Sequence, residues 1–405
     1  MKRSVLGAWP RAARRTLAVG LALLVPGAAA LATPASPVRA TAPATWTPDD
    51  PMDGGNDRGN FFNQVRIVRR GERVRALPVA ARQITVSYTW EGKTWTLDDY
   101  MRAYNVSGVL VLKDGEVVLE RYAQGRQPTD RWMSQSVAKS VLSLLYGAAL
   151  QDHRLKLEDT VERYVPELKG SAYDGVTIRD LLTMSSGVKW EEGYVGGQSD
   201  LAKYYRAAAT GDAVRDFQSK LPRAHPPGTT FHYDTAETHL AGLVLSRAVG
   251  MSVSDYLSEK IWKPMGAERD AAWRVDHQGR EFTGCCLLMT LADYARIGQF
   301  ALDDGVVDGK RVLPPGWIAE STRRQIDNGR PAPAGYGFFW WIGAEAYEAS
   351  GIYGQSILVY PKDRIVIAVN SEWPKPDDPE LFRALGAFQN AIRDAVREAA
   401  AKPAH

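Results

Sequence analysis

Apolar positions follow two different patterns along the chain, and the two patterns predict different elements. Val109 to Lys113 and Glu116 to Tyr122 are rich in β-branched residues and flank Asp114-Gly115, which predicts a β-hairpin with a tight turn. From Val137 to Leu150 the sequence is apolar on nearly every side of a helix. This second pattern predicts a helix that runs through the protein interior.

Helical spacing dominates the middle of the chain, and strand spacing returns near its end. Between residues 155 and 302 we expect helices over 157–165, 178–184, 199–209, 236–248, 253–261 and 290–303. Short runs rich in aromatic and β-branched residues predict strands over 337–343, 347–353, 355–360 and 364–370. A closing helix is expected over 381–400.

Strands near both ends of the chain enclose this helical middle, which predicts an α/β fold whose sheet is built from distant segments. We expect an α/β lobe made of residues 81–135 and 304–400, and an all-helical lobe made of residues 136–303. The interior helix would then begin where the two lobes meet. Clefts between such lobes are common catalytic sites.

The first 32 residues have the features of a secretory signal peptide. The apolar run Leu17–Leu24 follows a basic region, and Ala30-Leu31-Ala32 fits a small-residue cleavage site. The apolar run is too short to span a membrane stably, so we expect an exported protein, periplasmic or secreted, with no stable membrane insertion after cleavage. An uncleaved membrane anchor is the alternative. Residues 33–80 would form an extended leader.

Charge and metal-ligating residues exclude several classes of function. Residues 1–32 carry five positive charges and no negative ones, so their removal changes the formal net charge from +3 to −2. A mature chain near neutrality gives no electrostatic reason to bind nucleic acid or a membrane surface. A helix that starts near Thr235 would separate His232 from His239, so we expect no metal site, and no cofactor is implied. Adjacent cysteines such as Cys285 and Cys286 close a strained ring and are more often left reduced, and the sequence leaves their state open.

Ser136 and Lys139 carry the strongest chemical signal. Residues three apart on a helix have side chains roughly 5–6 Å apart, so a hydrogen bond between them is expected. An adjacent base can activate a serine hydroxyl, and lysine can be that base when burial lowers its pKa. The alternative is an N-cap serine followed by an ordinary polar lysine. A second copy of the spacing, from Ser186 to Lys189, contains Gly187, which predicts a helix stop between the two side chains.

A serine hydrolase with a lysine base also needs a proton shuttle and backbone N–H donors for the oxyanion. Tyr233 is the shuttle candidate, because it lies in a loop between Pro227-Gly228 and the helix expected from Ala236. A lysine ammonium beside it would lower its pKa and favour the phenolate. The alternative is a tyrosine that only packs on a helix N-terminus.

Three motifs resemble, in this order, those of the serine β-lactamase and penicillin-binding-protein superfamily: Ser136-x-x-Lys139, Tyr233-Asp234-Thr235 and Gly351-Ile352-Tyr353-Gly354. The tyrosine-bearing form resembles the class C branch and its esterase relatives. The stretches most similar to the nylon-oligomer (6-aminohexanoate-dimer) hydrolases are Pro227-Gly228-Thr229, Gly284-Cys285-Cys286 and Ser350 to Gln355. The resemblance covers roughly residues 80–400 and implies a β-lactamase/transpeptidase-like fold, with an antiparallel sheet flanked by helices.

The resemblance implies a role for each of the matching residues. Ser136 would be the nucleophile that accepts the acyl group, Lys139 its base, and Tyr233 the residue that assists proton transfer. The oxyanion would bind the backbone N–H groups of Ser136 and Gln355. Tyr194 falls where the nylon-oligomer enzymes carry a substrate-binding tyrosine, in the glycine-rich loop of residues 190–197, which could close as a lid.

Two departures from the class C pattern concern substrate binding. Thr235 stands where class C enzymes have asparagine, and Ile352, followed by Tyr353 and Gly354, replaces the lysine of the K-T-G motif. The amide that grips an acylamino side chain and the usual anchor for a β-lactam carboxylate are therefore missing. The strand that contains Ile352, Tyr353 and Gly354 would still border the substrate.

These residues predict a serine hydrolase that forms an acyl-enzyme on Ser136. Its substrate would be a small-molecule amide or ester, such as a 6-aminohexanoate-oligomer-like amide or a short ester. A D-amino-acid peptidase of the penicillin-binding type would use the same three residues and is one alternative. A catalytically silent binding protein on the same fold is the other. The sequence leaves the oligomeric state open.

Overall fold

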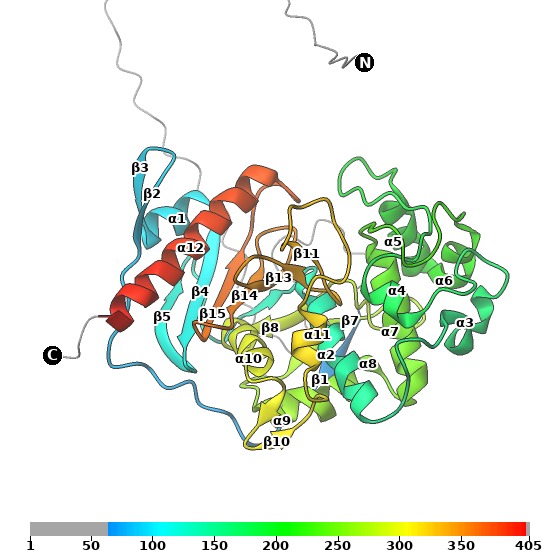
Figure 1. The fold of residues 1–405 in the computed structure, drawn as a ribbon, viewed down its shortest axis with the longest axis horizontal. Helices are drawn as coiled ribbons and strands as arrows, with labels where there is room; N and C mark the ends of the chain where they lie inside the picture. The colour runs from blue at the N-terminus through cyan, green and yellow to red at the C-terminus, as the bar shows by residue number, and fades with distance from the viewer. Residues whose placement is uncertain (1–63, 402–405) are drawn as a thin grey trace, which may run out of the picture. The chain divides into compact units, whose positions relative to one another are not determined.

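The computed structural model describes residues 64–401, shown in Figure 1. The expected signal peptide (1–32) and the expected leader up to residue 63 lie outside the described residues. Among residues 64–401, no helix is both long enough and apolar enough to cross a membrane.

A seven-stranded antiparallel sheet forms the centre of the α/β lobe, with the strand order β11-β12-β13-β14-β15-β4-β5. The expected hairpin is confirmed: β4 and β5 are joined by Asp114 and Gly115, which both have positive φ (53° and 85°), as a tight hairpin turn requires. The strands are β4 (Val106–Lys113), β5 (Glu116–Tyr122), β11 (Gly335–Tyr336), β12 (Trp341–Ile342), β13 (Tyr347–Ser350), β14 (Ser356–Tyr360) and β15 (Ile365–Ser371).

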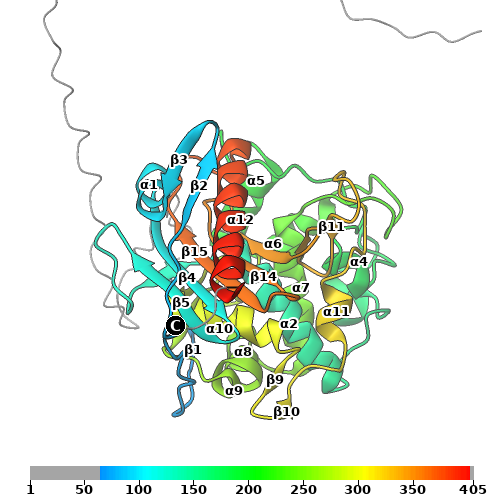
Figure 2. The same cartoon turned by 60° about the vertical axis from the view of Figure 1, so that its left-hand side comes forward.

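Alternation along the central strands supplies apolar side chains to both faces of this sheet. In β4, Val109 and Val111 pack in the cluster beneath α12 (Pro379–Ala401) and α1 (Leu97–Ala103). Leu110 and Leu112 instead join the cluster that contains α2 (Val137–Gln151) and α10 (Leu291–Leu302). Figures 1 and 2 show α12 running across the outer face of the sheet. The sheet is thus covered by helices on both faces, as predicted.

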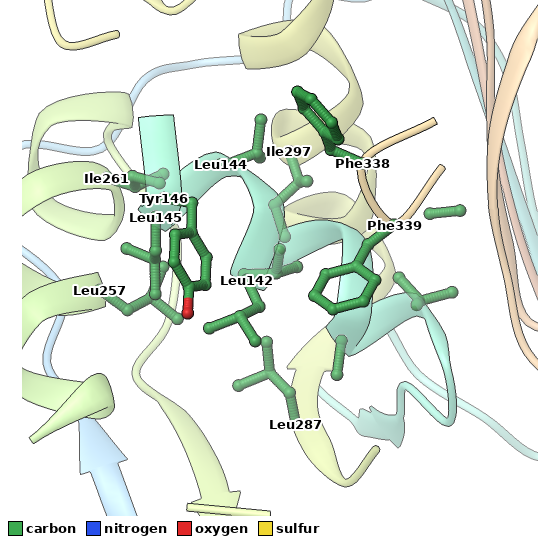
Figure 3. Close-up of a cluster of buried hydrophobic side chains, with 14 of the residues drawn as sticks. Leu142, Leu144, Leu145, Tyr146, Leu257, Ile261, Leu287, Ile297, Phe338 and Phe339 are labelled. Atoms are coloured by element: carbon green, nitrogen blue, oxygen red, sulfur yellow. The ribbon is translucent and has the colours of Figure 1, made fainter. Parts of the chain in front are cut away.

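The predicted interior helix is confirmed as α2, which is buried from Val137 to Ala149. Figure 3 shows Leu142, Leu145 and Tyr146 among side chains from several other elements. The helix is packed so closely that a Cβ at Gly147 would lie 2.5 Å from the Trp317 ring. A polar side chain on this helix is therefore removed from water unless it reaches a cleft.

Two strands lie inside the region predicted to be all-helical, which corrects that prediction. β7 (Ala271–Arg274) and β8 (Leu287–Thr290) form a four-stranded sheet with β1 (Val65–Val68) and β6 (Arg131–Met133), in the order β1-β7-β8-β6. Every residue of β7 and β8 is buried, so neither strand shows the alternation that identifies a half-exposed strand. β1 also places residues 65–68 of the expected leader in a sheet.

The remaining elements complete the two lobes. The short strands are β2 (Ser87–Trp90), β3 (Lys93–Thr96), β9 (Val306–Val307) and β10 (Lys310–Arg311). The helices are α3 (Val161–Tyr164), α4 (Ile178–Leu182), α5 (Asp200–Thr210), α6 (Ala213–Asp216), α7 (Thr235–Val249), α8 (Val253–Leu257), α9 (Lys263–Met265) and α11 (Trp317–Ser321). Helix α10 lies in the predicted helical lobe but packs on β4, β14 and β15 of the large sheet.

Gly298 of α10 and Gly386 of α12 form a matched pair for testing helix packing on the sheet. A Cβ at Gly298 would lie 2.4 Å from Val366 Cγ1 and 2.8 Å from Ile357 Cγ2, whereas one at Gly386 meets no heavy atom within 4 Å. We predict that Gly298→Ala lowers the free energy of unfolding by about 1–3 kcal/mol through overpacking. Gly386→Ala should raise it by up to about 1 kcal/mol, because alanine favours a helix. Urea denaturation measures both, and a Gly298→Ala variant as stable as wild type would contradict this packing.

Candidate active site

Ser136 lies at the junction between β6 and α2. The preceding residue, Gln135, has a positive φ of 46°, which marks a sharp turn into the helix. Ser136 occupies the N-cap position, but its side chain makes no capping hydrogen bond. Its hydroxyl instead borders a cleft. The interpretation of Ser136 as an ordinary helix cap is therefore wrong.

The Lys139 amine is in hydrogen-bond contact with the Ser136 hydroxyl. Lys139 Nζ lies 3.0 Å from Ser136 Oγ, 3.2 Å from Thr235 Oγ1 and 2.6 Å from the Gly284 carbonyl oxygen. It also lies 5.0 Å from the centre of the Tyr233 ring. The residues of the first two motifs thus meet around one nitrogen, although they are about a hundred positions apart in sequence.

Burial changes the chemistry of this amine. Desolvation lowers the pKa of Lys139 from 10.5 to about 8, although the charges of Glu192 and Asp234 act in the opposite direction. In a substantial fraction of molecules, the Lys139 amine is then neutral near pH 8. A neutral amine has a lone pair, so Lys139 can accept a proton from Ser136.

Glu192 fixes the direction of the hydrogen bonds around Lys139. The Thr235 hydroxyl donates to Glu192 Oε1 at 2.5 Å, because a carboxylate can only accept. Thr235 Oγ1 must then accept from Lys139, and the Gly284 carbonyl can also only accept. A neutral amine has two N–H bonds and one lone pair. With both N–H bonds directed to Thr235 and Gly284, the lone pair remains for the hydroxyl of Ser136.

Tyr233 also lies beside the nucleophile, but its predicted pKa shift has the wrong sign. Burial, with smaller effects of Tyr336 and Glu192, raises the pKa of Tyr233 well above its usual value, although a hydrogen bond with Ser136 lowers it. Its ring stacks on Trp341 with centroids 5.7 Å apart. Desolvation favours the protonated phenol, so Tyr233 is suited to donate a proton and not to act as a phenolate.

The cleft at Ser136 has a volume of about 660 Å³. Tyr194 lines it as expected, and the Tyr194 hydroxyl donates to Glu192 Oε1 at 2.9 Å. Glu192 thereby joins the glycine-rich loop to Thr235. The lining residues are Ser136, Glu192, Tyr194, Tyr233, Arg330, Trp341, Glu348, Ser350, Gly351, Ile352, Asp377, Pro379, Phe382, Arg383, Leu385, Gly386 and Gln389.

The strand that borders the cleft is β13, and this corrects the expectation for Gln355. Among the described residues, the cleft wall includes Gly351 and Ile352, which directly follow β13, but not Gln355. Gln355 is only 3% exposed, and its side-chain amide donates to the Ser371 carbonyl at 3.0 Å. The chain turns after Ile352, and Gln355 directly precedes β14, where its carbonyl accepts from Gly351 N at 2.8 Å.

Tyr353 and Gly354 do not line the cleft in the described part of the chain either. Tyr353 is buried in the cluster beneath α12. Gly354 has a positive φ of 87° and approaches Trp373 so closely that a Cβ would lie 2.4 Å from the ring. These two residues form the turn between β13 and β14. Of the four residues in the third motif, only Gly351 and Ile352 border the substrate space.

Other candidates from the sequence lie apart from this site. Lys189 of the second serine–lysine spacing is exposed, whereas Ser186 is buried and hydrogen-bonded to Glu237. His232 bonds to the Trp190 carbonyl, and His239 bonds to Tyr204. Within residues 64–401, no group of three or more metal-ligating side chains is assembled.

Cys285 and Cys286, whose state the sequence leaves open, are joined by a disulfide. Sequence reasoning also assigned no role to Glu192 or Gly284, although Gly284 accepts from Lys139 and Glu192 accepts from Thr235, a partner of Lys139. Neither residue has a distinctive spacing from Ser136. Their contributions depend on the folded loops, one through a carboxylate and the other through a backbone carbonyl.

Comparison with known proteins identifies the family. The sequence profile of the Beta-lactamase family matches residues 96–390. The chain is 33% identical to the 6-aminohexanoate-dimer hydrolase of Paenarthrobacter ureafaciens over 285 residues, which cover 66% of this chain and 73% of that protein. The chain belongs to the Beta-lactamase family. It is a serine hydrolase of the β-lactamase/transpeptidase superfamily, as the sequence predicts.

Solved structures support the fold. A Bacillus anthracis protein named as a candidate 6-aminohexanoate-dimer hydrolase matches with a TM-score of 0.76 at 24% identity, covering 84% of this chain and 92% of that chain. EstCE1, described as a hydrolase with promiscuous acyltransferase activity, matches with a TM-score of 0.58 at 17% identity, covering 73% and 94%. At these identities the likeness shows a shared β-lactamase-like α/β fold.

The pKa of Lys139 predicts a pH dependence for the reaction of Ser136. Only the neutral amine can take the serine proton, so labelling of Ser136 by a fluorophosphonate should speed up as pH rises, with a midpoint near pH 8. Burial also raises the pKa of Glu237 to about 8, so Glu237→Gln is the matched control and should keep the midpoint. Labelling rates of the wild type and of Glu237→Gln, measured at pH values on both sides of 8, test this prediction. A flat profile, or a midpoint that disappears in Glu237→Gln, would contradict the role of Lys139.

Proposed function

We propose that this serine hydrolase cleaves linear amides of the 6-aminohexanoate-oligomer type, through an acyl-enzyme on Ser136. The observation that carries the proposal is the contact of Lys139 Nζ with Ser136 Oγ, Thr235 Oγ1 and the Gly284 carbonyl at the wall of an open cleft. These contacts provide a nucleophile, Ser136, and a base, Lys139, whose lone pair is directed at the Ser136 hydroxyl.

In the first step, neutral Lys139 takes the hydroxyl proton as Ser136 Oγ attacks the substrate carbonyl carbon. The developing oxyanion would be bound by the backbone N–H groups of Ser136 and Ile352. Both residues line the cleft, and in the described part of the chain neither N–H donates to another backbone carbonyl. Two donors preorganised in this way stabilise charge that appears only in the transition state.

Tyr233 would then deliver a proton to the leaving group. Burial favours the protonated phenol, and the phenol is close enough to Ser136 for that residue to affect its pKa, so it lies near the bond that breaks. Once its proton has passed to the leaving amine, the phenol would be restored by the proton held on Lys139. Water then attacks the acyl-enzyme by the reverse route, with the same base.

The composition of the cleft supports a linear substrate with charged ends. Trp341 and Phe382 provide apolar surface, whereas Arg330 provides a positive charge and Asp377 and Glu348 provide carboxyl groups. A 6-aminohexanoate dimer has apolar methylene segments, an amine at one end and a carboxylate at the other, so it matches this lining. The Paenarthrobacter relative, named for that substrate, supports the same assignment.

A β-lactam is a poorer match to the site. Thr235 stands at the position of the class C asparagine. Its hydroxyl already donates a hydrogen bond to Glu192 and accepts one from Lys139. It has no amide with which to hold an acylamino group. The loop residues that follow β13 supply no lysine near the cleft in the described residues.

Short esters are the second candidate substrate class. EstCE1 and a family VIII carboxylesterase share the fold, the latter with a TM-score of 0.56 at 18% identity, covering 73% of this chain and 96% of that chain. The same serine, base and oxyanion donors cleave an ester, whose leaving group needs less help from a proton donor. Ester turnover is therefore expected beside amide turnover.

A substrate panel tests the proposal. The purified protein is assayed with 6-aminohexanoate dimer, p-nitrophenyl butyrate, a D-alanyl dipeptide and a chromogenic cephalosporin, with Ser136→Ala as the inactive control. We predict hydrolysis of the first two and an acyl adduct that peptide mapping places on Ser136. Turnover of the D-alanyl peptide alone would favour the peptidase alternative. A folded protein that forms no adduct with any of them would favour the silent binding protein.

Tyr233→Phe tests the proton donor within this scheme. We predict that kcat/KM for the amide falls about 10²–10⁴-fold, the usual contribution of a general acid. The loss for the p-nitrophenyl ester should be much smaller, because p-nitrophenolate leaves without a proton. Parallel kinetics on the two substrates measure this difference, and equal losses would rule out Tyr233 as the shuttle.

A further inference from the structure

The Cys285–Cys286 disulfide lies beside the proposed base and has no part in the mechanism given above. It joins adjacent residues, and each cysteine is 6% exposed. Both belong to a buried cluster that includes Met133, at the end of β6, and Trp190, near the start of the glycine-rich loop. The chain has only these two cysteines, so any effect of thiol chemistry on it must come from this bond.

The residues on either side of the disulfide contact the base and the segment just before the nucleophile. Gly284, which precedes it, accepts the hydrogen bond of Lys139 Nζ at 2.6 Å. Leu287, which follows it, accepts from Ser134 N at 2.8 Å and donates to Ser134 Oγ at 3.2 Å. Ser134 is two residues before Ser136. In sequence, the disulfide therefore lies between Gly284, which contacts the base, and Leu287, which contacts the segment that leads to the nucleophile.

The backbone between these contacts is in a conformation that needs support. Cys286 has φ of +71°, a left-handed value that is uncommon for residues other than glycine. Gly284 lies so close to Thr235 that a Cβ would be 2.7 Å from the Thr235 carbonyl oxygen. A covalent ring through Cys285 and Cys286 restricts the rotations that would let this segment relax. A small displacement of Gly284 would release one N–H of Lys139 and turn its lone pair away from Ser136.

We propose that the Cys285–Cys286 disulfide is a brace that positions the Gly284 carbonyl and, through it, the lone pair of Lys139. The two cysteines are positioning residues, since neither lines the substrate cleft in the described part of the chain. The inference rests on the proposed function of Ser136 and Lys139. Reduction by a dithiol breaks the S–S bond and transfers two electrons and two protons to the sulfurs. It yields two cysteine thiols and the cyclic disulfide of the reductant.

The experiment compares the oxidised protein, the protein reduced with dithiothreitol under denaturant-free conditions, and the variant Cys285→Ser/Cys286→Ser. Thiol titration verifies zero and two free thiols in the first two samples. Single-turnover labelling with p-nitrophenyl butyrate separates substrate binding from acylation of Ser136. The serine variant treated with dithiothreitol is the control for effects of the reductant itself, and thermal denaturation checks that each sample is folded.

We predict that reduction lowers the acylation rate constant about tenfold to a hundredfold, the scale expected for a misplaced catalytic group, with little change in substrate affinity. Reoxidation should restore the rate, and the serine variant should be slow and insensitive to reductant. The midpoint of the pH profile should also move to lower pH, because loss of the carbonyl acceptor disfavours the lysine ammonium. A merely structural role would not move that midpoint.

Two results would count against the inference in distinguishable ways. Equal acylation by the oxidised protein, the reduced protein and the serine variant, all folded, would overturn the brace and leave the proposed function in place. Failure of the oxidised wild type to acylate at Ser136 at all would overturn the proposed function and, with it, the brace.

Discussion

The desolvated amine of Lys139 is the constraint on which the rest of the site depends. An amine in water is protonated at neutral pH and cannot serve as a base for serine. Helix α2 removes this amine from water because nearly every side of the helix is packed. The cost of burying a charge then favours the neutral form, and the neutral form has a lone pair. The burial of α2 in the core thus makes the Lys139 amine able to act as a base.

Desolvation alone would not direct that lone pair. Thr235 and Gly284 accept from the two N–H bonds, and because the Thr235 hydroxyl donates to Glu192, Thr235 can only accept from Lys139. These partners come from the start of α7, from the segment before β8 and from the glycine-rich loop. The two lobes and the small sheet therefore have to assemble before the amine is oriented. The same assembly brings Ile352, which follows β13, to the wall of the cleft.

Local signals in the sequence predicted the parts of this arrangement that depend on short spacing. The contact of Ser136 with Lys139 follows from helix geometry, and the β4–β5 hairpin follows from Asp114-Gly115. Signals that depend on tertiary packing were misjudged. β7 and β8 are buried on both faces and show no alternation. The pKa of Tyr233 is raised mainly by desolvation, and no sequence pattern reports how deeply this tyrosine is buried.

The third motif shows how family patterns and structure can disagree by a few residues. The family resemblance implies Gln355 at the oxyanion, whereas the pairing of Ser350 with Ser356 turns the chain between them and leaves Ile352 at the cleft. The disulfide is a similar case, because adjacent cysteines carry no sequence signal for pairing and only the turn around Cys286 brings the sulfurs together.

The central claim is that Lys139 is neutral in a large fraction of molecules near pH 8. Nuclear magnetic resonance of protein labelled with ¹³C at the lysine ε-carbon measures this directly, with the Lys139 signal assigned by its absence from Lys139→Arg. The account predicts a titration midpoint near pH 8 for this signal. A midpoint near the ordinary lysine value of 10.5 would show that the amine remains an ammonium and would contradict its role as the base.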